Sequence, residues 1–327
     1  MKPINESLYT LVLVLCVASV LAPRLVWGGD ARRYPPVDVD LNATQVSKNV
    51  YYVQGAAGIA TENAGFVSNA GFVVTTEGVV VFDALGTPSL AARLVDEIRR
   101  ITTQPVRKVV LSHFHADHAY GLQVFAEMGA TIIASHGAVD YLSSDIAPER
   151  LAERRRSLAP WVNQDTRLVM PHELVKEDYR FTLGAHEFLV TNLGSAHSEG
   201  DVALFVEPDK VLFSGDIIFE GRIPFLGSAN TRNWLETLKR MERTEVNAMV
   251  PGHGPVTENP KDVLTLTRSY LQYMREKMTE AVSDWVPFDE AYEKIDWSEF
   301  LEYPAFVEAN RRNAYAVYLS IEAELLQ

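Results

Sequence analysis

The sequence contains very little cysteine. The only cysteine among 327 residues is Cys16, which lies in an apolar stretch near the N-terminus. If that stretch is removed from the mature protein, as its composition predicts (below), no thiol remains. Disulfide bridges, thiolate metal ligands and a cysteine nucleophile are then excluded, and any metal ion must be bound by histidine and carboxylate side chains.

Positive charge is also scarce. The chain has 30 lysine and arginine residues against 43 aspartate and glutamate residues, which gives a formal net charge of −13 at pH 7. A field of that sign repels a polyanion, so nucleic acid is disfavoured as a partner and a small-molecule substrate is favoured. Because 47% of the residues are hydrophobic, disorder is disfavoured, and one large core or a domain with a helical appendage is expected. The sequence indicates no oligomeric state.

Only one long apolar run is present, at residues 8–21. It follows a thin positive region at Lys2, ends at Pro23 and precedes Gly28, where a signal peptidase could cleave. These features predict that residues 1–28 are a signal peptide and that the protein is periplasmic or secreted. The alternative is an uncleaved membrane anchor, the only membrane contact that we expect. The run is shorter than the ~20 residues that a spanning helix needs, so cleavage is favoured.

The apolar pattern predicts alternating strands and helices. Strands are expected at residues 50–54, 71–75, 78–83, 106–111, 130–134, 179–183, 186–192, 202–206, 211–214 and 248–250, with 106–111 buried on both faces. Helices are expected at residues 87–101, 119–128, 137–161, 232–243, 262–282 and in the last 40 residues. The charged helix at 137–161 is expected to form a flap over the core. This order predicts an α/β fold, a four-layer αβ/βα sandwich at residues 45–258 with a helical C-terminal extension at 259–327.

Three histidines and an aspartate follow the strand predicted at residues 106–111. They are His113, His115, Asp117 and His118. His113 and His115 are two residues apart, so in an extended segment both imidazoles point to the same side and can meet one metal ion. Asp117 and His118 come where the chain turns and point to a neighbouring position. A group of this kind is costly to desolvate unless it binds something, so a metal site is favoured over structural histidines.

Three further candidate ligands lie far along the chain. His197, Asp216 and His253 each come where a predicted strand ends, next to glycines that permit tight turns. The remaining histidines lack this context and are interpreted as structural: His136, His172 and His186.

This set of residues resembles the metallo-β-lactamase superfamily. The superfamily signature is His-x-His-x-Asp-His followed by a distant His, Asp and His, and all seven positions match within about residues 50–255. The resemblance implies that one metal ion is bound by His113, His115 and His197 and a second by Asp117, His118 and His253, with Asp216 bridging. It also implies that Asp83 braces the loop of ligands, and Asp201 is expected to fix an imidazole. The implied cofactors are two divalent metal ions, Zn²⁺ with iron or manganese as alternatives.

Some branches of the superfamily have other residues at the positions of Asp216 and His115, so the resemblance is closer to some branches than to others. β-Lactamases with a cysteine ligand have that cysteine where this chain has Asp216, so their subclass is excluded, and a bridging aspartate is similar to the glyoxalase II, lactonase and phosphodiesterase branches. The flavodiiron branch has glutamate at the position of His115. The signal segment, residues 51–83 and residues 310–315 look most like periplasmic zinc metallohydrolases that accompany quinoprotein dehydrogenase relays or sulfur-oxidation systems.

The resemblance implies a zinc-dependent hydrolase. Two metal ions that share a water lower its pKa towards neutrality, and the resulting hydroxide would attack the carbonyl of a small ester, thioester, lactone or amide. Asp117 is the expected catalytic residue, which orients the nucleophile or passes its proton on. Tyr120, Arg222 and Asn230 are candidate substrate-binding residues, because they lie close along the chain to His118 and Asp216.

Two other functions remain open. A mononuclear iron dioxygenase acting on persulfides would keep the same histidines and aspartates. A periplasmic metal-binding accessory protein of a redox system would bind metal without turnover. Metal content and oxygen consumption separate these functions from hydrolysis.

Overall fold

A computed structural model describes residues 33–326 of the chain, apart from the side chains of residues 260–263. The predicted signal peptide, residues 1–28, lies outside the described residues. Within the described part, no helix is both long enough and apolar enough to cross a membrane.

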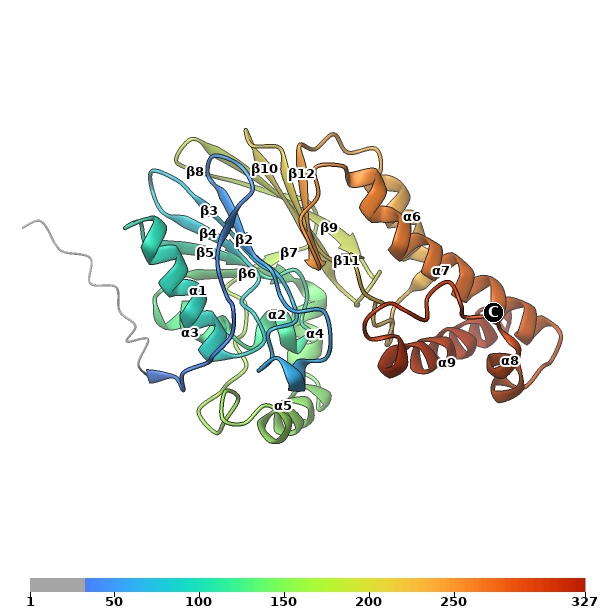
Figure 1. The fold of residues 1–327 in the computed structure, drawn as a ribbon. Helices are drawn as coiled ribbons and strands as arrows, with labels where there is room; N and C mark the ends of the chain where they lie inside the picture. The colour runs from blue at the N-terminus through green and yellow to red at the C-terminus, as the bar shows by residue number, and fades with distance from the viewer. Residues whose placement is uncertain (1–32, 327) are drawn as a thin grey trace, which may run out of the picture.

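Two β-sheets lie face to face, with helices on their outer faces (Figure 1). The first sheet has seven strands in chain order: β1 (Thr44–Gln45), β2 (Val50–Val53), β3 (Ala70–Val74), β4 (Val79–Phe82), β5 (Val106–Val110), β6 (Thr131–Ser135) and β7 (Glu173–Val175). The second has five: β8 (Tyr179–Leu183), β9 (His186–Gly194), β10 (Asp201–Glu207), β11 (Val211–Phe219) and β12 (Ala248–His253). The pairs from β1 to β4 are antiparallel and those from β4 to β7 are parallel. In the second sheet only the pair β11–β12 is parallel.

The space between the sheets is filled by apolar side chains from both. Val80 and Phe82 of the first sheet and Phe213 of the second belong to one buried cluster, and the rings of Phe82 and Phe213 stack at 5.3 Å. Gly71 leaves room for this contact, because a Cβ at that position would collide with the ring of Phe213. Burying each such ring contributes about 1.5–3 kcal/mol, so this interface fixes how the sheets, and the loops at their edges, face each other.

Helices α1 (Pro88–Ile101) and α3 (Leu122–Glu127) cover the outer face of the first sheet. Local sequence explains where α1 begins. The hydroxyl of Thr87 accepts a hydrogen bond from the backbone N–H of Leu90 at 3.1 Å, and Pro88 occupies the first turn, where its missing N–H costs nothing. Thr87, the first residue of the helix predicted at 87–101, is therefore the N-cap of α1.

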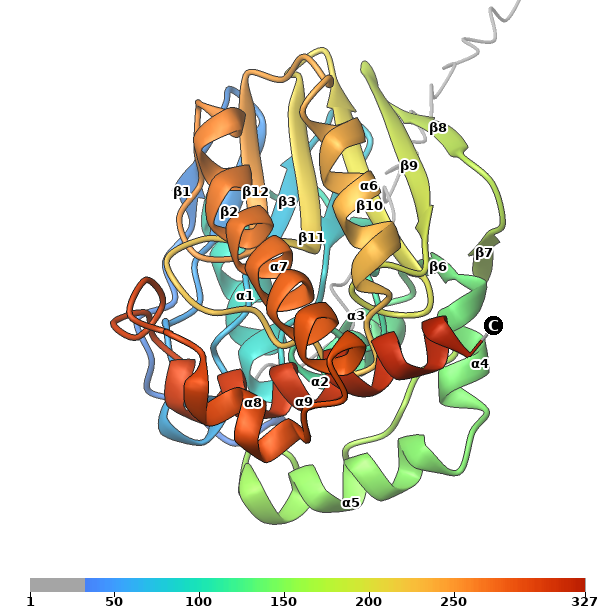
Figure 2. The ribbon, with the colours of Figure 1, turned by 90° about the vertical axis from the view of Figure 1, so that its right-hand side faces the viewer.

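Helices α6 (Thr231–Met241) and α7 (Pro260–Ser283) cover the outer face of the second sheet (Figure 2). Helices α8 (Phe288–Lys294) and α9 (Phe306–Leu325) pack on α7. Buried side chains of β11, α6, α7 and α9 form a single apolar cluster. The extension predicted from residue 259 onwards thus supplies one of the layers of the sandwich through α7, and the domain boundary itself stays a prediction.

The predicted α/β sandwich with a helical C-terminal region is confirmed, and three local predictions need correction. The helix predicted at 119–128 is divided into α2 (Ala116–Ala119) and α3, because the N–H of Gly121 donates to the carbonyl of Leu85 outside the helix. The helix predicted at 137–161 is divided into α4 (His136–Leu142) and α5 (Ile146–Ser157). Between them the hydroxyl of Ser144 bonds to the carbonyl of Tyr141 and competes with helical hydrogen bonding. Strand β5 is not buried throughout, since Arg107 is exposed.

Candidate metal centre

All seven predicted ligands meet at one edge of the sandwich. Four of them, His113, His115, Asp117 and His118, lie between the end of β5 and the end of α2. His197 lies in the loop between β9 and β10, Asp216 lies within β11, and His253 ends β12. Both sheets therefore contribute, and the face-to-face packing of the sheets brings the two sets of side chains together.

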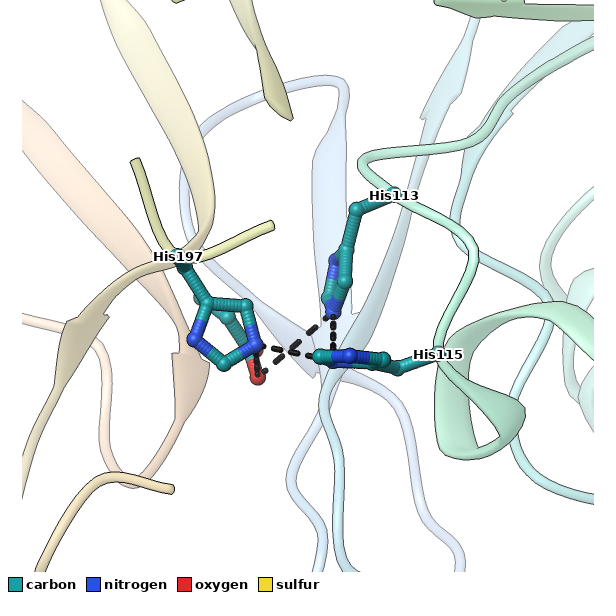
Figure 3. A group of neighbouring side chains, drawn as sticks. His113, His115 and His197 are labelled. Carbon is teal, nitrogen blue, oxygen red and sulfur yellow. Dashed lines mark hydrogen bonds and ion pairs between the residues drawn. The ribbon is translucent and has the colours of Figure 1, made fainter. Parts of the chain in front are cut away.

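The first group of neighbouring ligands is His113, His115, His197 and Asp216, whose ligand atoms lie within 4.8 Å of one another. The Nε2 atoms of His113 and His197 each lie 2.9 Å from Nδ1 of His115. Oδ2 of Asp216 lies 3.3 Å from Nε2 of His197 and 3.8 Å from Nε2 of His113. In Figure 3 the three imidazoles point towards one another. Imidazole nitrogens and a carboxylate oxygen that converge in this way are the donor set that a divalent transition metal prefers.

The second group is Asp117, His118 and His253, again with ligand atoms within 4.8 Å. Oδ2 of Asp117 lies 3.6 Å from Nε2 of His118 and 3.4 Å from Nε2 of His253. Asp216 also reaches this group, because its Oδ1 lies 3.0 Å from Nε2 of His118 and its Oδ2 lies 3.3 Å from Nε2 of His253. One carboxylate is therefore in contact with both groups.

The outward ring nitrogens of His253 and His118 each lie beside a hydrogen-bond acceptor. Nδ1 of His253 lies 2.7 Å from the backbone carbonyl of Val67, and Nδ1 of His118 lies 2.8 Å from Oδ2 of Asp83. A carbonyl and a carboxylate accept only, so both Nδ1 atoms carry protons. In the neutral imidazole this leaves Nε2, the inward atom, with a free lone pair.

Asp83 connects the ligands of the two groups. Its carboxylate accepts from the backbone N–H of Ser112 at 2.7 Å, from the Ser112 hydroxyl at 2.8 Å and from His118. The Ser112 hydroxyl also lies 2.9 Å from Nδ1 of His113, which must donate because the hydroxyl proton goes to Asp83. Asp83 thus holds His118 directly and His113 through Ser112, which agrees with the bracing function expected from the sequence.

Two buried polar atoms at the centre have no hydrogen-bond partner among the described residues. They are Nε2 of His118 and Oδ1 of Asp216, which lie 3.0 Å apart as an ion pair but lack hydrogen-bond alignment. Buried polar atoms are normally satisfied, and exceptions call for a reason. A cation between the two atoms satisfies both, so the residues present fit a bound metal ion.

Burial and mutual charges set the protonation of the centre. Burial lowers the pKa of His113 well below its usual value and that of His197 to about 3, so both imidazoles are neutral. Burial alone would raise the pKa of Asp216, but His253 and His118 hold it well below its usual range. Burial likewise opposes ionisation of His118, yet Asp216 and Asp83 raise its pKa well above the usual value. Carboxylates here are balanced by protons on imidazoles, which a metal ion would displace.

The sequence model of the metallo-β-lactamase superfamily matches residues 63–253, which is more than half of the chain and includes all seven ligands. The chain belongs to this superfamily. Its members are mostly metal-dependent hydrolases.

Individual relatives act on different substrates. A metallo-β-lactamase type 2 from Elizabethkingia meningoseptica is 27% identical over 193 residues, which are 58% of this chain and 69% of that protein. A linear primary-alkylsulfatase from Pseudomonas sp. is 20% identical over 286 residues, 74% of this chain and 54% of that protein. An acyl-coenzyme A thioesterase from Gallus gallus is 30% identical over 156 residues, 44% of this chain and 55% of that protein. This chain therefore spans only about half the length of the last two.

Solved structures share the fold. A metallo-β-lactamase from Pontibacter korlensis matches with a TM-score of 0.56 at 22% identity, covering 71% of this chain and 99% of that one. The sec-alkylsulfatase Pisa1 from Pseudomonas sp. matches with a TM-score of 0.66 at 17% identity, covering 86% of this chain and 50% of that one. The 86% of this chain that matches Pisa1 is more than the part that precedes residue 259. The likeness in fold therefore includes part of the helical extension.

Asp201 was expected to fix an imidazole, but its hydrogen bonds go to the loop around His197 and not to the ring itself. Its carboxylate accepts hydrogen bonds from the backbone N–H groups of Ala196 and Ser198 at 3.1 and 2.9 Å and from the Ser198 hydroxyl at 2.7 Å. It therefore holds the loop on either side of His197, whereas the outward Nδ1 of that imidazole has no partner among the described residues. Burial raises the pKa of Asp201 to about 7.

Of the three candidate substrate-binding residues, only Arg222 lies beside a ligand. Its Nη1 is 3.4 Å from Nδ1 of His253, and its guanidinium lies over the ring of Phe225 at 5.4 Å. The side chain is only 2% exposed, so it packs behind His253 and does not face solvent. Burial lowers its pKa.

Tyr120 and Asn230 have local structural contacts. Tyr120 is 2% exposed and packs with Leu151 in a small apolar cluster beneath α5. Asn230 is exposed and caps α6, where its side chain accepts from the N–H of Asn233 at 3.0 Å. Substrate binding by any of the three stays a prediction.

Sequence reasoning overlooked two residues that position the ligands. Ser112 stands beside His113 in the motif, and its place between a buried strand and a ligand was a usable signal. Asn69 gave no signal in the sequence. It is 3% exposed, and its amide donates to the carbonyls of Pro251 and Gly254 at 2.8 and 2.7 Å. Asn69 thereby attaches the loop of His253 to the first sheet.

Proposed function

We propose that the protein is a hydrolase with a dinuclear metal centre, in which His113, His115 and His197 bind one ion and Asp117, His118 and His253 bind the other. Asp216 would bridge the two. The observation that carries this proposal is the position of Asp216, whose two carboxylate oxygens lie within 3.8 Å of imidazoles from both groups. Membership of a superfamily of mostly metal-dependent hydrolases supports it.

The donor set favours zinc but does not demand it. Four histidine and carboxylate donors for each ion suit Zn²⁺, and they also suit iron and manganese. A thiolate, which would select more strongly, is missing because the only cysteine is Cys16. We therefore propose two divalent ions, with Zn²⁺ as the first choice.

Bound metal ions would activate a water molecule and polarise the bond to be cleaved. The chain's own contribution comes from Asp117 and His115, which are the two partly exposed ligands, whereas the other five are buried. Substrate therefore reaches the centre from their side. The Asp117 side chain is 27% exposed, so one carboxylate oxygen can accept a hydrogen bond from an attacking water and take up its proton. His118 and His253 hold the pKa of Asp117 below its usual range, although burial alone would raise it, so the carboxylate is ionised and able to accept.

The substrate that we propose is a small molecule with an ester, thioester, lactone or amide bond. The relatives include a thioesterase as well as β-lactamases and an alkylsulfatase. Asp216 stands where β-lactamases with a cysteine ligand have that cysteine, which argues against β-lactam cleavage. We also propose that residues 1–28 direct the protein to the periplasm or outside the cell. The narrower resemblance to zinc metallohydrolases of quinoprotein and sulfur-oxidation systems stays a prediction.

Metal analysis combined with a substrate panel tests the proposal. We expect two metal ions per chain, and hydrolysis of at least one ester, thioester, lactone or amide without oxygen. His115→Ala should abolish hydrolysis and lower the metal content. His136→Ala should do neither, because His136 is exposed and, among the described residues, its side chain bonds only to Asp140. One iron per chain with oxygen consumption on a persulfide would instead indicate the dioxygenase, and two metal ions without any hydrolysis would indicate the accessory protein.

A further inference from the structure

The segment Val67–Asn69, which leads into β3, is in contact with candidate ligands from both sides of the sandwich. All three of its residues are buried. Its hydrogen bonds reach α2, which carries Asp117 and follows the first sheet, and the end of β12 in the second sheet, which carries His253. Asp117 and His253 are two of the three ligands in the second group.

Ser68 holds the backbone of Asp117. In a continuous helix the carbonyl of Asp117 would accept from the N–H of Gly121, four residues later. That N–H donates instead to the carbonyl of Leu85, because α2 has ended. The hydroxyl of Ser68 donates to the carbonyl that is left without a helical partner. This bond fixes α2 at Asp117 and so sets the direction from which its carboxylate reaches the second group.

The other two residues of the segment hold the end of β12 over four consecutive positions, 251–254. The backbone N–H and the side-chain amide of Asn69 donate to three carbonyls there, at distances between 2.7 and 2.8 Å. These carbonyls belong to Pro251, Gly252 and Gly254. The fourth residue is His253, whose Nδ1 lies 2.7 Å from the carbonyl of Val67. The segment thus holds the imidazole of His253 as well as the backbone on both sides of it.

The orientation of the Asn69 amide is itself fixed by a neighbouring turn of the chain. Its Oδ1 accepts from the backbone N–H of Gly55 at 3.1 Å, so its NH₂ group must face the two carbonyls of the β12 end. A Cβ at Gly55 would lie 2.4 Å from the backbone of Val67, so this close approach requires glycine. All hydrogen-bonding groups of the amide are therefore satisfied in one orientation.

The first group of ligands is held in a different way. Within residues 33–326, no hydrogen bond of the segment goes to His113, His115 or His197. The loop of His197 is held by Asp201, which belongs to the second sheet as the loop itself does. The segment Val67–Asn69 therefore acts on the ligands of one group only.

We propose that Ser68 and Asn69 are positioning residues that set the affinity of the second metal ion separately from that of the first. This inference rests on the proposed dinuclear centre and deepens it. Asp117 and His253 come from opposite sides of the sandwich, and one buried segment holds both. Ligands that are fixed before an ion binds lose less conformational freedom on binding, which raises the affinity.

Zinc binding to variants that lose these bonds tests the proposal without turnover. Ser68→Ala should raise one of the two zinc dissociation constants about 2- to 10-fold, the factor for one neutral hydrogen bond. Asn69→Asp should raise the same constant further, because the ionised carboxylate cannot donate to the two carbonyls. Competition with a chromophoric chelator measures both constants on the full chain, and circular dichroism checks the fold. Ser68→Ala, the milder change, keeps the test decisive if Asn69→Asp does not fold.

Two ligand variants identify which ion is affected. His197→Ala leaves the second group of ligands complete, and His253→Ala leaves the first group complete. When Ser68→Ala is added, the remaining zinc ion should bind more weakly to the His197→Ala protein and equally well to the His253→Ala protein. A residue that only stabilised the fold would affect both proteins alike.

Thr75→Val is the matched control. Thr75 is buried beyond the other end of β3, where its hydroxyl donates to the carbonyl of Gly78 at 2.8 Å. The substitution removes a hydroxyl, as Ser68→Ala does, and should leave both zinc constants at their wild-type values.

The proposal is overturned if Ser68→Ala and Asn69→Asp bind both zinc ions as tightly as the wild type, if they weaken both ions equally, or if the control weakens the second ion as well. Failure of the proposed function would appear separately, in the wild-type protein, as fewer than two zinc ions per chain or as an absence of hydrolysis across the substrate panel.

Discussion

Replacing Asp83 with asparagine should weaken metal binding at the group that contains His118. The amide keeps one oxygen for the N–H of Ser112, but it presents an NH₂ group to the Ser112 hydroxyl and to Nδ1 of His118, both of which donate in the wild-type protein. To accept from that NH₂, His118 must move its proton to Nε2, the atom that faces Asp216 at 3.0 Å. A protonated Nε2 cannot bind a metal ion.

The size of the effect follows from the bond that is lost. A hydrogen bond to a charged group contributes about 1.5–3 kcal/mol, which corresponds to roughly 10- to 100-fold in a dissociation constant. Loss of a carboxylate that orients a metal-binding imidazole typically costs the same factor. We therefore expect one of two zinc dissociation constants to rise by about 10- to 100-fold and the other to change less, because His113 is connected to Asp83 only through Ser112.

Competition with a chromophoric zinc chelator measures both constants. A matched control is Asp209→Asn, because Asp209 accepts from His186 at 3.1 Å in a similarly buried pair outside the centre. The control should bind both zinc ions as the wild-type protein does. The reasoning is refuted if Asp83→Asn binds two zinc ions with wild-type affinity, or if the control loses affinity equally.

Three further predictions concern other parts of the structure. Asn313→Ala should lower the free energy of unfolding by about 2–4 kcal/mol in urea titrations, because the buried amide bonds to two backbone groups of the loop after β11; a loss below about 1 kcal/mol would contradict this. Gly252→Ala should reduce zinc binding while circular dichroism shows an intact fold, because the added Cβ would collide with the carboxylate of Asp216. A variant that binds as much zinc as the wild type would contradict this prediction. Hydrogen bonds and charge from Arg275 lower the pKa of Glu324 below its usual 4.5, so its stabilisation is present above that pH and is lost as the pH falls through the folded value. Urea titrations between neutral pH and about pH 3 should therefore find Glu324→Gln less stable than the wild type near neutral pH and equally stable near pH 3. A difference in the free energy of unfolding that does not change with pH would contradict the interaction between Glu324 and Arg275.

The grouping of the seven candidate ligands could be predicted because it depends on residue type and spacing. His113 and His115 alternate along an extended segment, and His197 and His253 stand where a strand meets a loop. Asp216 lies within β11, directly after Gly215, whose φ of 54° interrupts the regular strand. The alternation of apolar segments likewise predicted the sandwich. These signals are local in the chain, so no knowledge of the packing was needed to read them.

Contacts between distant segments could not be predicted in the same way. The division between α2 and α3 depends on Gly121, whose N–H finds the carbonyl of Leu85 from another element. The burial of Arg222 depends on packing behind His253, which no spacing in the sequence reveals.

The hydrogen bond between Asn313 and the N–H of Leu226 has a consequence for the order in which the protein matures. These residues are 87 positions apart, and ribosomes add about 5–20 residues per second. The loop that follows Asp216 therefore waits roughly 4 to 17 s for the segment that holds it in place. All seven candidate ligands precede Asn313 in the chain, so the residue that fixes this loop is made after every residue that would bind metal.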